Sequence, residues 1–239
     1  MPVPKVPNLT GVQRRRLKAN TLTIYRYVPI GRLLELLRTK QLSFMKISKW
    51  DDPFEGHLID LYCQIFTQFD PEAVKSKFAF SCWSLTSESD HIWRIYTPNK
   101  DGVRISVHLA ELLLAQPRVK AGAVEYPEQS EIRQRIKAFG AMTSKQSGLF
   151  FVKRYAFQAE KELRLMVTAK NDEEKAKTII PLLFDKRLIH GLRFDPRMDV
   201  EHYECLKSYL ANQYSLDKKI MTQSLLYQPN RVFKSNPPP

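Results

Sequence analysis

The sequence predicts an α+β fold, a single domain with a mixed or antiparallel, strand-rich core and surrounding helices. Three observations lead to this prediction. The chain has 239 residues, of which 43% are hydrophobic, enough to bury one large core. Strand-like runs outnumber helical ones, and the helices fall at uneven intervals instead of alternating regularly with strands. The charged fraction of 26% is ordinary, which excludes a disordered or collagen-like chain.

The first half of the chain begins with a strand at 21–28, rich in β-branched and aromatic residues. Pro29 then opens a helix whose apolar residues Ile30, Leu33, Leu34 and Leu37 share one face. The same reasoning predicts further strands at 41–45, 77–84, 103–108 and 119–126, and helices at 56–69, at 87–96 behind a Ser87 cap, and at 109–115.

The second half opens with an amphipathic helix at 128–139, in which Glu131 and Arg135 form an i,i+4 pair. Three strands are expected next, and Asp199 then caps a final helix that runs to about residue 210. The three strands are 162–168, 177–183 and 188–194.

The positive charge is concentrated at the two ends of the chain. The formal net charge is +13, and nine of the excess positive charges lie in 1–20 and 218–239, which contain no acid. We therefore expect a basic, Pro-rich N-terminal arm at 1–20, one α+β domain at 21–217 and a basic C-terminal tail at 218–239. Such charge favours anionic partners, namely nucleic acid, nucleotides or an acidic membrane surface, although solubilising tails would look the same.

The cysteines and the N-terminal residues indicate a soluble, cytoplasmic protein with no membrane partner. Cys63, Cys82 and Cys205 are odd in number and far apart, so they predict no disulfide framework. No apolar run has the length of a signal peptide core or a membrane span.

The most distinctive motif is the acidic and basic row Glu160, Glu162 and Arg164. On a strand these three side chains share one face, about 6.5–7 Å apart. Two carboxylates and a guanidinium can bind sugar hydroxyls, orient a nucleophile or stabilise a cationic transition state. A solvated sheet face with ion pairs is the alternative interpretation.

Three other motifs have both a functional and a structural interpretation. Asp51 and Asp52 precede a Pro in a rigid loop, where they could hold a metal, contact a ribose or cap a helix. Trp93 and Tyr96 on one helix could stack on a nicotinamide or adenine ring, or pack in the core. Arg26 lies among core-facing neighbours on the first strand, so it needs an anionic partner or an edge position.

Several known templates are absent. The chain contains no glycine-rich dinucleotide or phosphate loop and no nucleophile elbow. Its histidines (His57, His91, His108, His190 and His202) show no metal-ligand spacing, so no metal site is expected.

In order, these motifs resemble the bacterial family catalogued as domain of unknown function 2971. The resemblance covers about residues 22–195, with Asp51, Arg26, Phe157 and Leu163 departing from the family pattern. The matching residues are Tyr25-Arg26-Tyr27, Asp52-Pro53-Phe54-Glu55, Cys82-Trp83-Ser84, Trp93-Arg94-Ile95-Tyr96, Gly102, Lys153, Phe157, Glu160, Glu162 and Arg164.

The layout of these motifs is also similar, more distantly, to the ADP-ribosyltransferase superfamily. That resemblance implies Glu162 as the catalytic acid, Glu160 as the residue that orients the acceptor, and Tyr96 as a nicotinamide stacker. It implies NAD as the cofactor and co-substrate. The residues expected to bind it are Tyr25, Arg26, Asp52, Ser84, Trp93 and Arg164.

The function implied is an NAD-dependent ADP-ribosyltransferase-like enzyme, a bacterial toxin or phage-defence effector with a possible antitoxin. Its acceptor would be a nucleic acid or a protein, contacted by Lys153 and by Arg14, Arg15 and Arg16. A non-enzymatic nucleic-acid-binding module that uses Trp93 and Tyr96 is one alternative. A nuclease that uses Asp52, Glu160 and Glu162 around magnesium is the other.

Overall fold

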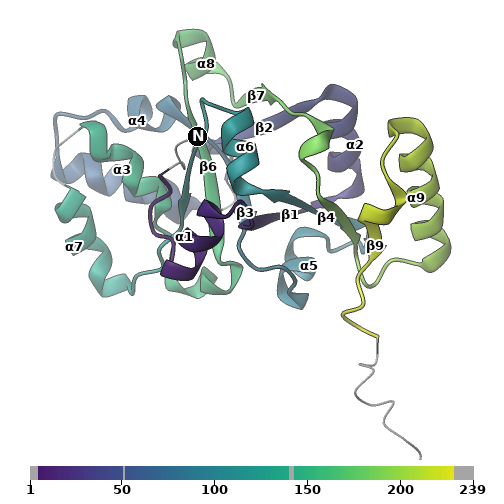
Figure 1. The fold of residues 1–239 in the computed structure, drawn as a ribbon. Helices are drawn as coiled ribbons and strands as arrows, with labels where there is room; N and C mark the ends of the chain where they lie inside the picture. Colours follow the sequence, from purple (N-terminus) through teal and green to yellow (C-terminus); the bar gives the residue numbers. More distant parts are fainter. Residues whose placement is uncertain (1–4, 51, 140–142, 229–239) are drawn as a thin grey trace, which may run out of the picture.

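The computed structural model describes residues 5–50, 52–139 and 143–228. Within these residues the chain forms one nine-stranded sheet flanked by helices (Figure 1), which confirms the predicted α+β class. The strand order is β5-β6-β3-β1-β4-β8-β9, with β2 pairing with β3 and β7. The strands are β1 (Thr23–Pro29), β2 (Gln41–Lys46), β3 (Phe78–Ser84), β4 (Gly102–His108), β5 (Lys120–Ala123), β6 (Glu162–Thr168), β7 (Ile179–Leu183), β8 (Gly191–Phe194) and β9 (Met221–Gln223).

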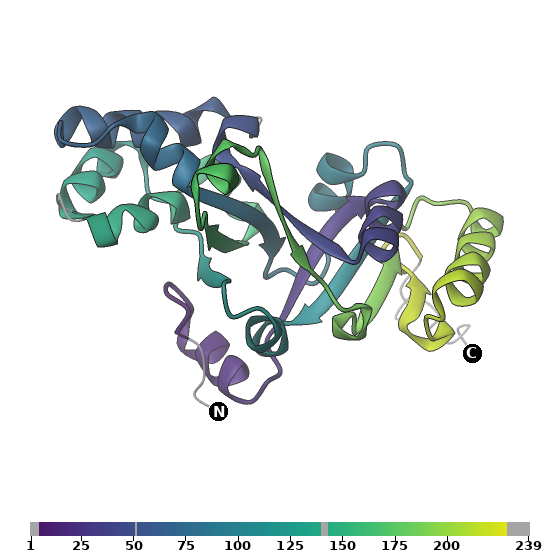
Figure 2. The same cartoon turned by 90° about the horizontal axis from the view of Figure 1, so that it is seen from above.

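Nine α-helices surround the sheet in the described part of the chain. They are α1 (Gly11–Lys18), α2 (Ile30–Thr39), α3 (Pro53–Ile65), α4 (Pro71–Lys77), α5 (Asp90–Tyr96), α6 (Leu109–Ala115), α7 (Gln129–Phe139), α8 (Asp172–Ala176) and α9 (Val200–Tyr214). Figure 2 shows α3, α4 and α7 gathered at one end of the molecule, with α9 at the other. None of the described helices combines the length and apolarity needed to cross a membrane.

Most predicted elements are present, with shifted ends. The expected Ser87 cap is wrong, since Ser89 occupies the N-cap position of α5. Helices α4 and α8, 7 and 5 residues long, were not predicted, because so short a segment shows little periodicity.

Two apolar clusters hold the sheet and its helices together. The larger one lines the sheet and the helices α2 and α6, with Leu33, Leu112 and Leu165 completely buried. The smaller one packs α3 against the opposite side of β3, through residues such as Ile59, Tyr62 and Phe80. Burial of this kind is the main favourable term in folding.

The sheet is least extensively paired around β3, which has two register pairs with β2 and one with β1. Strand β1 pairs with β4 over its whole length, and β3 pairs with β6 over its whole length. Between β1 and β3, however, the register contains only Tyr25 opposite Ser84. The two halves of the sheet therefore meet at one point and separate beyond it.

The N-terminal segment differs from the loose arm that the sequence suggests. Thr10 begins α1 with a capping box, and the side chains of Leu9 and Leu17 are almost completely buried in the larger cluster. Asn8 also donates a hydrogen bond to the carbonyl of Ala123. The arginines of α1 lie on its exposed side, so the segment is basic outside and apolar inside.

The beginning of the expected C-terminal tail is likewise part of the fold. Strand β9 pairs in parallel with β8, and Met221 is completely buried. Residues 229–239 of that tail, residues 1–4 of the expected arm and the motif residue Asp51 lie outside the described residues.

Candidate active site

A cavity of about 350 Å³ opens where β1 and β3 separate. Its walls come from β1, α2, β2, β3 and α5, together with Glu160 and Glu162. The volume lies at the lower end of the range typical of small-molecule sites. The cavity brings together six of the residues predicted for the site: Tyr25, Arg26, Ser84, Tyr96, Glu160 and Glu162.

The sequence predicts Glu160 and Glu162 on one strand, and this prediction is wrong for Glu160. Glu160 ends a 3-10 helix, η3 (Tyr155–Glu160), and Lys161 then takes a left-handed conformation with φ of 43°. Only Glu162 begins the strand β6. The turn between them brings both carboxylates to one ammonium group, with Lys153 Nζ at 2.8 Å from Glu160 and 3.4 Å from Glu162.

Glu162 is buried and held ionised. Its carboxylate accepts hydrogen bonds from Arg164 Nε (2.8 Å) and Nη2 (3.1 Å), and its side chain is only 4% exposed. Burial acts to raise the pKa of Glu162, but the charges of Arg164 and Lys153 outweigh it and lower the pKa to about 2. The site therefore presents a fixed negative charge at any physiological pH.

Arg164 lies behind the cavity and fixes this carboxylate. Its side chain is 1% exposed, its Nη1 donates to the carbonyl of Phe150 (2.6 Å), and its guanidinium lies 4.5 Å from the ring centre of Trp50. Arg164 Nη2 also lies 2.5 Å from Glu55 Oε2. Since Arg164 does not line the cavity, its predicted role as a cofactor-binding residue is wrong and its contacts give it a positioning role.

Tyr96 and Ser84 hold Glu160 from two sides. The Tyr96 hydroxyl donates to Glu160 Oε2 at 3.3 Å, and Ser84 Oγ donates to the Glu160 carbonyl at 2.7 Å. Burial, followed by the negative charge of Glu160, raises the pKa of Tyr96, so its hydroxyl stays protonated as a donor. The register also aligns Tyr25, Ser84 and Glu162 across β1, β3 and β6.

Arg26 is a cation in the wall of the cavity. It lines the wall on β1 and forms no hydrogen bond or ion pair with any residue that the structure describes. Burial lowers the pKa of Arg26, although arginine stays charged under physiological conditions. A desolvated guanidinium without a counter-ion indicates a site for an anionic ligand.

Trp93 and Asp52 do not belong to the cavity, contrary to the prediction. Trp93 is 0% exposed and packs edge-on against Tyr27, with the ring centres 4.7 Å apart. It is therefore a core residue that cannot stack on a ligand. Asp52 caps α3 through the Phe54 N–H and accepts a hydrogen bond from Arg154 (3.0 Å). Neither residue lines the cavity.

The predicted acceptor-binding residues also lie outside the cavity wall. Lys153 is buried between the two glutamates, and its ion pairs assign it to holding them in place. Arg14, Arg15 and Arg16 are exposed on α1.

Sequence reasoning missed one acidic member of the network. Glu55 is buried in the first turn of α3 beside Arg164, and its burial raises its pKa to about 7 against the opposing charge of Arg164. The network thus contains three carboxylates and two cations. The carboxylates are Glu55, Glu160 and Glu162, and the cations are Lys153 and Arg164. The motif Asp52-Pro53-Phe54-Glu55 contains this residue, but an acid in the first turn of a helix is usually an exposed one that stabilises the helix N-terminus.

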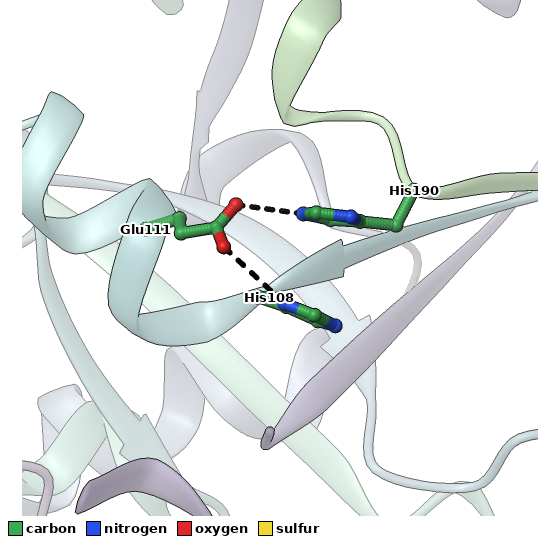
Figure 3. Close-up of side chains that lie close together, drawn as sticks. All are labelled: His108, Glu111 and His190. Carbon is green, nitrogen blue, oxygen red and sulfur yellow. Dashed lines mark hydrogen bonds and ion pairs between the residues drawn. The ribbon is translucent and has the colours of Figure 1, made fainter. Parts of the chain in front are cut away.

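A second group of side chains was missed because its members lie far apart in the sequence. His108, Glu111 and His190 come together at the end of β4 (Figure 3). The spacing of the histidines along the chain gave no sign of this arrangement.

Comparisons with known proteins give distant likenesses to solved structures. No family model matches the chain, so its resemblance to domain of unknown function 2971 is not confirmed, and no curated protein matches it. The structure is similar to DarT from Thermus sp. 2.9 in complex with NAD+, with 12% identity, 84% of this chain and 94% of that chain covered, and a TM-score of 0.39.

The second likeness is to the same Thermus protein in complex with ADP-ribosylated ssDNA. Here the identity is 12%, the coverage is 81% of this chain and 89% of that chain, and the TM-score is 0.38. Both TM-scores lie below 0.5, a level at which a likeness does not establish a shared activity.

Proposed function

We propose that this chain is an NAD-dependent ADP-ribosyltransferase-like enzyme that uses the cavity between β1 and β3. The observation that carries the proposal is the polarity of that cavity. Arg26, a guanidinium without a partner among the described residues, lines it on β1, and two buried carboxylates line it from the end of η3 (Glu160) and the start of β6 (Glu162). A ligand that complements both would present an anion to Arg26 and a fixed or developing positive charge to the carboxylates.

NAD has both properties when its glycosidic bond breaks. Its diphosphate is an anion that Arg26 can bind by charge-assisted hydrogen bonds. Cleavage of the bond between the ribose C1 and the nicotinamide nitrogen gives an oxocarbenium-like transition state, which a nearby carboxylate stabilises. Glu162 is suited to this role because Arg164 and Lys153 keep it ionised.

The transfer step assigns the second carboxylate to the acceptor. The electron pair of the breaking bond leaves with nicotinamide, and a nucleophilic atom of the acceptor forms the new bond to C1. The acceptor's proton goes to a general base, a role that Glu160 can fill beside Glu162. Tyr96, which donates to Glu160 at 3.3 Å, positions that carboxylate.

The geometry disfavours the two alternative functions. In a nucleic-acid-binding module Trp93 and Tyr96 would both stack on bases, but Trp93 is completely buried. In a magnesium nuclease the acidic side chains would face a common metal ion. Here Lys153 already lies between Glu160 and Glu162, and Asp52 is paired with Arg154.

The setting we propose is that of a cytoplasmic bacterial toxin or phage-defence effector, with a nucleic acid or protein as acceptor and a possible antitoxin. The basic face of α1, which carries Arg14, Arg15 and Arg16, supports an acidic acceptor such as nucleic acid.

The test is transfer from labelled NAD, measured as nicotinamide release by chromatography and as label on oligonucleotide or protein by mass spectrometry. Glu162→Gln should reduce the rate about 100-fold or more, the usual cost of losing electrostatic stabilisation of the transition state. Glu131→Gln, which changes an exposed acid on α7, is the matched control and should keep the rate. No NAD consumption by the wild type with any acceptor, and no NAD binding, would overturn the proposal.

A further inference from the structure

The cluster His108, Glu111 and His190 lies on an edge of the fold that the proposed reaction does not use. His108 ends β4, Glu111 is in the first turn of α6, and His190 directly precedes β8. None of the three lines the cavity. Along β1 the cavity residue Arg26 lies opposite Ile105, whereas His108 lies three residues further on, opposite Thr23.

The polar atoms of the cluster already face one another (Figure 3). Glu111 Oε2 lies 2.6 Å from His190 Nε2, and Glu111 Oε1 lies 3.4 Å from His108 Nδ1. The three potential ligand atoms all lie within 4.8 Å of one another. Ligand atoms of a tetrahedral zinc site, with bonds of about 2.0–2.1 Å, are themselves about 3.3 Å apart.

We propose that His108, Glu111 and His190 form a binding site for a divalent transition-metal ion such as Zn²⁺. Two imidazoles and one carboxylate are the ligand set that such ions prefer, and three protein ligands leave a fourth position for water. Each imidazole nitrogen that now meets the carboxylate would give its lone pair to the metal ion, and the proton of the neutral ring would then lie on the other ring nitrogen.

The surroundings of the carboxylate prepare it to act as a ligand. Asn20 Nδ2 donates to Glu111 Oε1 at 2.9 Å, which orients the group from the segment after α1. The other carboxylate oxygen, Oε2, lies 2.6 Å from His190 Nε2, so contacts hold both oxygens of Glu111 in place.

The two rings have room to adjust around an ion. They stack with their centres 3.9 Å apart and an angle of 16° between their planes. Because a metal ion lies in the plane of the imidazole that binds it, at least one of two stacked rings must turn before both can bind the same ion. The side chains of His108 and His190 are 29% and 36% exposed, which permits this rotation and gives a metal access from solution. Once bound, the ion would connect β4, α6 and the turn before β8.

The test is metal titration of the full-length chain without a histidine tag. Cobalt(II) is the spectroscopic probe, because a tetrahedral site gives it intense visible absorption, and Zn²⁺ is then added as the competitor. We expect one ion per chain and a metal-dependent rise in Tm. His190→Ala and Glu111→Gln should each weaken binding by more than about tenfold, since only two protein ligands would remain.

His202→Ala is the matched control, because it removes an exposed histidine of α9 and should leave the affinity unchanged. Asn20→Ala should weaken binding by about tenfold, the usual cost of losing a partner that orients a metal ligand. If His190→Ala fails to fold, Glu111→Gln gives the same comparison with the side-chain shape kept. The proposal is overturned if the wild type shows no saturable binding, or if His202→Ala and Glu111→Gln bind the ion equally well. The readouts require no NAD turnover, so they are independent of the function proposed for the cavity.

Discussion

Arg26 shows how much one side chain can indicate about a ligand. Strand alternation places it among core-facing residues, and an arginine in such surroundings requires an anion. In the structure Arg26 lines a cavity and has no partner among the described residues. The described residues therefore do not supply the anionic partner that the sequence predicts for Arg26. This favours a bound ligand as that anion.

The first prediction concerns this side chain. Arg26→Gln should weaken NAD binding by about 10–100-fold, because a charge-assisted hydrogen bond contributes about 1.5–3 kcal/mol. The free energy of unfolding should not fall, since no described residue loses a partner. Calorimetric titration with NAD measures the first effect and urea unfolding the second. Arg38→Gln, at an exposed position of α2, is the control, and equal NAD affinity in both variants would contradict the prediction.

The second prediction concerns Glu55, whose pKa burial raises to about 7 in the folded chain. An acid whose pKa is raised by folding stabilises the fold while it is protonated. That contribution is complete below the unfolded pKa of about 4.3 and is lost as the pH rises through about 7. The wild type should therefore lose stability relative to Glu55→Gln between pH 5 and pH 8, with a slope of at most about 1.4 kcal/mol per pH unit. Urea unfolding across this range measures the difference, and parallel curves for the two proteins would contradict it.

At the scale of elements, the sequence predicts strands better than the turns between them. The alternation of Leu163, Leu165 and Val167 correctly predicts β6, because these residues form its buried apolar face. Glu160 was misplaced because Lys161 adopts a left-handed φ, which no hydrophobic pattern reveals. The same turn nevertheless brings both carboxylates to Lys153, so the acidic pair was predicted while its geometry was not.

The third prediction concerns α1, whose Arg-rich sequence hides its apolar side. Leu17 is 4% exposed and belongs to the main core cluster. Leu17→Ala should therefore lower the free energy of unfolding by about 2–5 kcal/mol. Val12→Ala, at a residue that is 52% exposed on the same helix, should change it by less than about 0.5 kcal/mol. Urea unfolding compares the two variants. Equal, small effects would mean that α1 behaves as the loose arm that the sequence suggested.

At the scale of the whole molecule, the separation of β1 from β3 creates the site. Local patterns cannot predict this feature, because it depends on a single register pair, Tyr25 with Ser84, between residues far apart in the chain. The same limit explains why His108 and His190 were not recognised as neighbours. The motifs that the sequence offered are short and local, whereas the cavity and the histidine cluster are products of strand order.

The last prediction concerns the arginines of α1, which contribute to the net charge of +13. It rests on the proposed function, because it takes the acceptor to be a nucleic acid. Arg14, Arg15 and Arg16 are exposed on α1 and form no part of the cavity wall, so they can attract phosphates without taking part in the reaction. If they contact a single-stranded acceptor, replacing all three by Gln should reduce the slope of log K against log salt by about 2, since each phosphate contact on single strands contributes about 0.7. Fluorescence anisotropy with a labelled oligonucleotide at several salt concentrations measures the slope. Glu162→Gln is the complementary control, because it should abolish transfer and leave this slope unchanged. An unchanged slope in the triple variant would instead assign the contact with the acceptor to another basic surface.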